Sequence, residues 1–382
     1  MFIYIHIPFC ASKCIYCDFF VVLSKHGGQD TYVDTLCREI NLRLKNKPNL
    51  PPIETLYIGG GTPSLLSASD YQRVFDTLRQ YTRFAPNAEI TLEANPLHLK
   101  DNPADYLSAG VNRLSIGVQS LNNDELKRLS RAHSAQQAVD FVKHMQQGGF
   151  NNISIDLMYG LPGQSLKSWR ETLQQVIALD IQHVSMYGLK VENNTPLEHL
   201  QHFERYQIPE DDDTVAMYFK ALSMLEEAGY QQYEFSNLAL SHNFESPEGD
   251  SIADYRSKHN LNYWQNGEYY AFGASAHGYI DGTRYETVRD LERWLANPLA
   301  GEYRPCLPKE QLENALIFGL RLRGGVDITA LEKQYAIDFK SRFGSILEKY
   351  QPLGLMEVDG HWLKLTKAAI PLSNSILADF IN

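Results

Sequence analysis

The first 235 residues alternate between two hydrophobic patterns. Short runs of β-branched and aromatic residues are typical of buried strands, and the longer segments between them repeat apolar residues every three or four positions, as amphipathic helices do. The clearest helices are expected at residues 31–44 and 212–228, and Ser69 is expected to cap a third. The predicted strands are residues 2–7, 55–58, 89–93, 113–118, 152–157 and 183–187, with a further short one at 233–235. Strands alternating with helices pair in parallel, so the pattern predicts an α/β fold.

Six strand–helix units are fewer than the eight that close a TIM barrel. We therefore expect a partial, open (β/α)6 TIM-like barrel over residues 1–236. In barrels of this kind the chemistry gathers at the carboxyl ends of the strands. The unusual residues of this chain lie at or just after the ends of the predicted strands in turn: Cys10, Gly59-Gly60-Gly61-Thr62, Glu93, Gln119, Asp156 and Tyr187. The sequence thus predicts a functional site at that end of the barrel.

The later part of the chain has a different pattern. Residues 237–258 are polar and rich in turn formers, which predicts a surface loop. We expect a connecting region at residues 237–305. From about residue 309 the pattern is helical, and residues 355–365 read as a β-hairpin turned by Asp359-Gly360. Helices followed by a hairpin predict a winged-helix-like domain at residues 306–382.

Composition narrows the class of protein. The 382 residues are 43% hydrophobic and 21% charged, as in a soluble globular protein, and the net charge of -11 gives no reason to expect nucleic-acid binding. We find no apolar run long enough to span a bilayer and no signal region, which predicts a cytoplasmic protein. Peripheral contact with a membrane is compatible with the sequence, and so is either a monomer or a homodimer.

Three of the five cysteines lie within eight residues, as Cys10, Cys14 and Cys17. In a reducing compartment such a cluster is more typical of a metal centre than of disulfides. Structural zinc normally takes four ligands, whereas a cubane iron–sulfur cluster held by three cysteines keeps one iron open. Both alternatives stand on the spacing alone. Cys37 and Cys306 stand apart, and we interpret both as small buried hydrophobic residues.

Several motifs resemble the radical S-adenosylmethionine (SAM) superfamily, in the branch of coproporphyrinogen dehydrogenase and the HemW haem chaperones. C-x3-C-x2-C after the first strand is the superfamily pattern. The branch resemblance covers nearly the whole chain and rests on Tyr4–Cys10, Gly59–Pro63, Leu92–Pro96, Ser115–Ser120, Arg131–His133 and Asp156–Gly163. It implies a [4Fe-4S] cluster whose open iron binds SAM, and one-electron cleavage of SAM to a 5′-deoxyadenosyl radical.

The resemblance also implies residue roles. Cys10, Cys14 and Cys17 would hold the cluster, while Tyr4 and Tyr16 would flank SAM, with Tyr16 near the adenine. The remaining SAM contacts would be Gly60, Gly61 and Thr62 at the methionine end, Glu93 and Arg131 at its amino and carboxylate groups, and Gln119 and Asp156 at the ribose. The alternatives without SAM binding are structural roles: an N-cap or solvated carboxylate for Glu93 and Asp156, and a surface ion pair for Arg131.

Within this branch the chain is more similar to the haem chaperones than to the dehydrogenase. Phe19 stands where the dehydrogenase pattern has a fourth cysteine, and Tyr4 lies almost at the start of the chain, where the dehydrogenase has a long preceding segment. The H-N-x-x-Y-W motif associated with haem in HemW proteins occurs as His259, Asn260, Tyr263 and Trp264. The resemblance implies a chaperone that passes haem to apo-proteins. The alternative function is oxygen-independent decarboxylation of coproporphyrinogen III, and the alternative role for His259 is a hydrogen-bonded histidine in an aromatic core. His277, in a glycine-flanked turn, is expected to face the SAM site.

Overall fold

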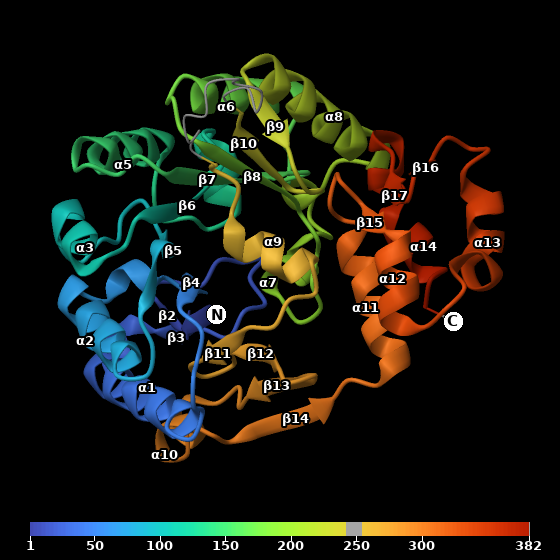
Figure 1. Cartoon of the computed structure of the whole chain (residues 1–382). Coiled ribbons are helices and arrows are strands. Elements are labelled where there is room, and N and C mark those ends of the chain that lie inside the picture. Colours follow the sequence, from blue (N-terminus) through green and yellow to red (C-terminus); the bar gives the residue numbers. More distant parts are fainter. Residues whose placement is uncertain (242–253, 382) are drawn as a thin grey trace, which may run out of the picture.

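The structure is a computed structural model that describes residues 1–241 and 254–381. Its centre is a nine-stranded sheet in the order β11-β1-β4-β5-β6-β7-β8-β10-β9 (Figure 1). Neighbouring strands from β11 to β8 are parallel, and β10 is antiparallel to both β8 and β9. The two edge strands, β11 and β9, do not pair with each other, so the barrel is open, as expected.

The six predicted strands are confirmed, several with longer bounds. They are β1 (Phe2–Ile7), β4 (Ile53–Gly60), β5 (Phe84–Ala94), β6 (Arg113–Gln119), β7 (Ile153–Tyr159) and β8 (His183–Gly188). Helices lie outside the ring of strands (Figure 1). The main ones are α1 (Gln29–Leu44), α2 (Ala68–Arg79), α3 (Pro103–Ala109), α5 (Ala135–Gln147), α6 (Leu166–Ile177) and α8 (Asp211–Glu227). Their buried apolar residues and those of the strands form one continuous core.

The cap of α2 differs from the prediction. Ser67, and not Ser69, is the N-cap residue: its hydroxyl accepts a hydrogen bond from the backbone N–H of Asp70, and the Asp70 carboxylate accepts one from the backbone N–H of Ser67. This reciprocal capping box satisfies two N–H groups that the first turn leaves unpaired. The helix therefore begins two residues earlier than predicted.

Both edges of the sheet differ from the prediction. Residues 233–235 do not form a strand; the chain instead makes β9 (Tyr230–Gln232) and β10 (Asn237–Leu240), the second inside the segment predicted as a loop. Residues 242–253 of that segment lie outside the described residues, and Lys258 at its end begins a helix. At the other edge, β11 (Tyr270–Phe272) pairs with β1, Ile3 opposite Tyr270, which the sequence pattern did not predict.

The chain after residue 254 adds a short helix, α9 (Lys258–Trp264), and a second sheet of β12 (His277–Ile280), β13 (Thr283–Thr287) and β14 (Gly301–Pro305). Helix α10 (Leu291–Ala296) lies between β13 and β14 in sequence. The domain division predicted at residues 236 and 305 stays a prediction.

The C-terminal part has the predicted combination of helices and hairpin. Helices α11 (Pro308–Gly319), α12 (Ile328–Tyr335) and α13 (Phe339–Tyr350) precede a hairpin of β16 (Met356–Asp359) and β17 (Trp362–Leu365), with β15 (Val326–Asp327) pairing on β17. A short helix, α14 (Ser373–Ala378), follows the hairpin. Within the described ranges, none of the helices is long and apolar enough to cross a membrane.

Candidate cofactor-binding cavity

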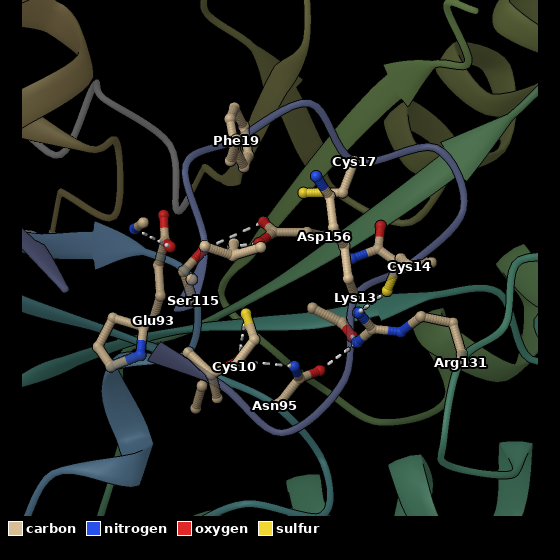
Figure 2. A pocket seen from close by; sticks show the side chains of 18 of the residues that line it. Cys10, Lys13, Cys14, Cys17, Phe19, Glu93, Asn95, Ser115, Arg131 and Asp156 are labelled. Atoms are coloured by element: carbon tan, nitrogen blue, oxygen red, sulfur yellow. Dashed lines mark hydrogen bonds between the residues drawn. The ribbon is translucent and has the colours of Figure 1, made fainter. Parts of the chain in front are cut away.

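A cavity of about 360 Å³ opens at the carboxyl ends of the barrel strands (Figure 2). The strand-end residues predicted from the sequence line it: Cys10, Gly60, Gly61, Thr62, Glu93, Gln119, Asp156 and Tyr187. Cys14, Cys17, Tyr16 and Arg131 line it as well. The parallel sheet thus brings together residues that lie far apart in sequence. Tyr4 does not line this cavity; its hydroxyl lies 3.0 Å from His6 Nδ1, and its ring stacks on Tyr57, which does.

The three cysteines of the N-terminal loop are free thiols that face this cavity. Burial raises the pKa of the Cys10 thiol to about 11, and burial also raises the pKa of Cys17. In the part of the chain that the structure describes, no three Cys, His, Asp or Glu side chains come together closely enough to hold a single metal ion. A cubane differs from a zinc ion in this respect, because each cysteine binds a different iron.

Two of the cysteine sulfurs accept hydrogen bonds from side chains. The Thr62 hydroxyl donates to Cys10 Sγ at 3.5 Å, and Arg131 Nη1 donates to Cys14 Sγ at 3.5 Å. Asn95 connects the two donors: its Oδ1 accepts from Arg131 Nη2, and its Nδ2 donates to Thr62 Oγ1 at 3.2 Å. Figure 2 shows these contacts around Cys10, Asn95 and Arg131. Arg131 Nη2 also donates to the carbonyl of Gly117.

The turn after β4 needs its glycines. Gly60 has φ +120°, a conformation that residues with a Cβ rarely adopt, and a Cβ there would lie 2.8 Å from the His6 ring. A Cβ on Gly61 would lie 2.7 Å from the carbonyl oxygen of Phe9. The turn therefore packs directly against the chain that leads into Cys10, and the N–H of Thr62 donates to that same carbonyl at 2.7 Å.

Two carboxyl groups face the cavity. Burial, followed by the nearby Asp156, raises the pKa of Glu93 to about 7, although hydrogen bonds from Tyr57 Oη at 2.9 Å and Gly60 N–H at 3.1 Å lower it. Burial also raises the pKa of Asp156, against hydrogen bonds from Ser185 and Ser115. Neither carboxylate caps a described helix, and Arg131 is directed inward, to Asn95 and the Gly117 carbonyl, so the N-cap and surface-ion-pair alternatives do not describe these residues. The roles of Glu93, Asp156 and Arg131 toward SAM stay predictions.

Comparisons with known proteins agree with this geometry. The model of the radical SAM superfamily matches residues 4–176, and that of the HemN C-terminal domain matches residues 307–372. The heme chaperone HemW of Lactococcus lactis is 33% identical over 99% of this chain and 96% of its own, and that of Bacillus subtilis is 34% identical over 99% and 98%. The chain belongs to the HemW family. Heme chaperone HemW of Escherichia coli is 40% identical over 75% of this chain and 73% of its own.

A solved structure supports the fold of this HemW-family chain. Coproporphyrinogen III oxidase (HemN) from Escherichia coli, a radical SAM enzyme, matches with a TM-score of 0.82 over 100% of this chain and 89% of that one. The two sequences are 22% identical, so the likeness shows the fold alone. It covers both the open barrel and the C-terminal domain.

The H-N-x-x-Y-W segment of this HemW-family chain forms α9, and its residues pack behind the cavity wall without lining the cavity. His259 is 1% exposed, with Nδ1 2.7 Å from Thr55 Oγ1 and Nε2 2.8 Å from Tyr263 Oη, and its ring stacks on Tyr57. Burial lowers the pKa of His259 to about 3. Asn260 and Trp264 also lie outside the residues that line the cavity. In this conformation both nitrogens of the imidazole are already hydrogen-bonded to the protein.

The expectation for His277 was wrong, whereas those for the two isolated cysteines were met fully or in part. His277 does not face the cavity but begins β12, exposed, with Nε2 3.4 Å from Glu286 Oε1. Cys306 is buried as expected, whereas Cys37 is partly exposed. Phe19 lines the cavity mouth and is 62% exposed.

Sequence reasoning also missed residues that line the cavity. Among them are Lys13, Tyr57, Asn95, Ser115 and Met158. Asn95 follows Glu93 within a motif that the family resemblance did include, so its place in sequence offered a signal. Tyr57, Ser115 and Met158 lie on strands β4, β6 and β7, where alternate residues point to the same side of the sheet. That alternation would have selected Tyr57 and Ser115 once the inner face was known.

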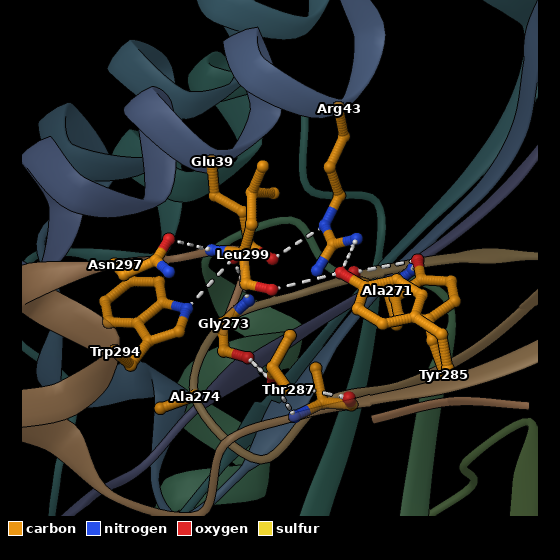
Figure 3. Close-up of polar contacts among 12 residues, drawn as sticks. Glu39, Arg43, Ala271, Gly273, Ala274, Tyr285, Thr287, Trp294, Asn297 and Leu299 are labelled. Carbon is orange, nitrogen blue, oxygen red and sulfur yellow. Dashed lines mark hydrogen bonds and ion pairs between the residues drawn. The ribbon is translucent and has the colours of Figure 1, made fainter. Parts of the chain in front are cut away.

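A buried polar network connects α1 with the turn after β11 and with α10 (Figure 3). Glu39 of α1 accepts hydrogen bonds from Gly273 N–H at 2.8 Å, Trp294 Nε1 at 3.2 Å and Arg43 Nε at 2.8 Å. Burial raises the pKa of Glu39, while Arg43 lowers it. A Cβ on Gly273 would lie 2.4 Å from the carbonyl oxygen of His6. The network thus holds the turn after β11 against β1, the strand that leads to Cys10.

Proposed function

We propose that this chain is a cytoplasmic haem chaperone that holds a [4Fe-4S] cluster and SAM in the cavity and passes haem to apo-proteins. The observation that carries the proposal is the cavity itself, which gathers three free cysteines and the polar ends of the barrel strands in one place. Relatives named heme chaperone HemW, similar over 99% of the chain, support the choice of haem as cargo.

The residues present fit an iron–sulfur cluster. Cys10, Cys14 and Cys17 supply one thiolate each for three irons, and hydrogen-bond donors point at two of these sulfurs. Three cysteines occupy three of the four irons of a cubane, which leaves one iron for SAM. When bound, the cluster supplies the single electron that SAM cleavage requires.

The residues present also fit SAM. We assign the ionised Glu93 to its ammonium group, Arg131 to its carboxylate, and Gln119 and Asp156 to the ribose hydroxyls, because charged and polar partners orient a zwitterionic nucleotide. Gly60, Gly61 and Thr62 allow close approach at the methionine end. Tyr16 lines the cavity and suits the adenine, while Tyr4 acts through the stacked ring of Tyr57.

The haem site is proposed at α9. For His259 to ligate haem iron, its Nε2 must exchange the Tyr263 hydroxyl for the metal, and Asn260 and Trp264 would flank the porphyrin. Tyr263→Phe removes this competitor and so should tighten hemin binding. If His259 is instead structural, Tyr263→Phe leaves hemin affinity unchanged.

The test is a titration of the purified protein with hemin, followed by the Soret band, for wild type, His259→Ala and Tyr263→Phe. Stoichiometric binding that is lost in His259→Ala supports the proposal, and its absence in wild type overturns haem carriage. Cluster formation is tested separately by anaerobic reconstitution with iron and sulfide and electron paramagnetic resonance (EPR). Anaerobic conversion of coproporphyrinogen III with SAM and dithionite would instead assign the decarboxylase activity.

A further inference from the structure

Cys10 and Cys14 are connected by a continuous chain of side-chain hydrogen bonds, which we call the sulfur bridge. It consists of Thr62, Asn95 and Arg131. Its members come from three places in the fold: the turn after β4, the residue after β5, and the segment after α4 (Asn123–Arg128). The bridge therefore forms only when the barrel is assembled.

Both ends of the sulfur bridge donate a hydrogen bond to a cysteine sulfur, Thr62 to Cys10 and Arg131 to Cys14. The Thr62 hydroxyl has one hydrogen, which points to Cys10, so its oxygen is left to accept from Asn95 Nδ2. The amide of Asn95 has one acceptor end and one donor end, which lets it join a cation to a hydroxyl. Thr62 is 2% exposed, so the Thr62 end of the sulfur bridge is buried.

The position of Arg131 does not depend on a nucleotide. Its Nη1 donates to Cys14, and its Nη2 donates to Asn95 and to the Gly117 carbonyl. The Tyr16 hydroxyl also contacts Cys14 and Arg131. The third sulfur, Cys17, accepts a hydrogen bond from the backbone N–H of Phe19, which no side-chain substitution removes.

We propose that the sulfur bridge raises the reduction potential of the cluster, with Asn95 as the positioning residue that couples Thr62 to Arg131. The inference rests on the proposed function, in which Cys10, Cys14 and Cys17 hold a cluster. Hydrogen bonds to cysteine sulfur stabilise the more electron-rich, reduced cluster, and hydrogen-bond partners of ligands tune a metal centre. The positive charge of Arg131 adds to this effect. Arg131 thus serves the cluster in addition to any contact with SAM.

The experiment is a redox titration of the reconstituted protein, followed by EPR and performed without SAM, so that nucleotide binding does not contribute. The variants are Thr62→Val, which keeps the shape and removes the hydroxyl, Asn95→Leu and Arg131→Gln. The matched control is Thr91→Val, because Thr91 is also a buried threonine, and its hydroxyl has no hydrogen-bond partner among the described residues. Thr62→Ser should restore the behaviour of wild type. Iron and sulfide content per chain is measured for each variant.

At a fixed ambient potential, the ratio of reduced to oxidised cluster should fall about threefold in Thr62→Val and Asn95→Leu and about tenfold in Arg131→Gln, because a hydrogen bond to a charged group is stronger than a neutral one. A tenfold change corresponds to about 59 mV for a one-electron couple. The effects of Thr62→Val and Arg131→Gln should be non-additive when Asn95 is present and additive when it is leucine, since Asn95 links them.

Failure of this inference differs from failure of the proposed function. If wild type forms no cubane by EPR, the proposed function fails. If wild type forms the cluster, but Thr62→Val and Asn95→Leu keep full iron content and the potential of Thr91→Val, the sulfur bridge has no part in tuning. Additive effects in the presence of Asn95 would overturn the coupling role of Asn95.

Discussion

The protonation of Glu93 should control the affinity for SAM. Burial and the nearby Asp156 raise the pKa of its carboxyl to about 7. In the proposed site the ionised carboxylate pairs with the ammonium group of SAM, and the neutral acid does not. SAM affinity should therefore rise as the pH increases through about 7, and weaken as the pH falls below it.

The size of the effect follows from the pKa. With a pKa of about 7, half of the Glu93 carboxyls are ionised at pH 7 and about a tenth at pH 6, so the affinity falls about fivefold over that unit and about tenfold for each further unit. Each tenfold step is about 1.4 kcal/mol of binding free energy. Asp156→Asn removes the second-largest cause of the raised pKa and should move the inflection to lower pH.

The assay is calorimetric titration of SAM into the reconstituted protein between pH 5.5 and about 7.5, below the range in which an α-amino group itself loses its proton. Iron content is checked at each pH, so that loss of the cluster is not mistaken for loss of affinity. Glu93→Gln should bind SAM weakly and with a flat pH profile. A flat profile in wild type, or an equally steep one in Glu93→Gln, would refute the assignment of the ammonium group to Glu93.

Three stability predictions use urea unfolding. Glu39→Ala should lower the free energy of unfolding by about 3–5 kcal/mol, because it leaves the Arg43 guanidinium without its partner; a loss below about 1 kcal/mol would contradict the importance of that network. His259→Ala should lower the free energy of unfolding by about 2 kcal/mol or more, since the hydroxyl of Thr55 loses a buried hydrogen-bond partner. Stability equal to wild type would mean that the hydrogen bonds of His259 do not stabilise the barrel. Ser67→Ala should lower the free energy of unfolding by about 1 kcal/mol, because α2 loses its N-cap. If Ser69→Ala lowers it by that amount and Ser67→Ala does not, Ser69 is the N-cap residue instead.

The site residues at the strand ends were predictable, because the barrel repeats the same strand–helix unit. Each parallel strand ends at the same side, so the polar residue that follows it must face the same space. This reasoning found Cys10, Glu93 and Asp156 without knowledge of their contacts. It did not find the link made by Asn95, because a bridge between two cysteines depends on side-chain positions from three separate segments.

Short strands and buried motifs were not predictable in the same way. The three residues of β11 are too few to show a periodic pattern, and the partner of β11 is the first strand of the chain. The aromatic motif around His259 indicated a ligand by resemblance, but the hydrogen-bond partners of its ring are Tyr263, four residues along α9, and a second residue that only tertiary packing brings close. One of them, Thr55, lies on β4.

The pairing of β1 with β11 has a consequence for biosynthesis. On the ribosome, β1 emerges before β4, which soon covers one of its edges, but the opposite edge stays unpaired until residues 270–272 have been translated. Unpaired strand edges recruit other chains, so a nascent or prematurely terminated product that lacks this segment is exposed to aggregation. The cysteine loop that β1 leads into thus reaches its final shape late, after most of the polypeptide has been made.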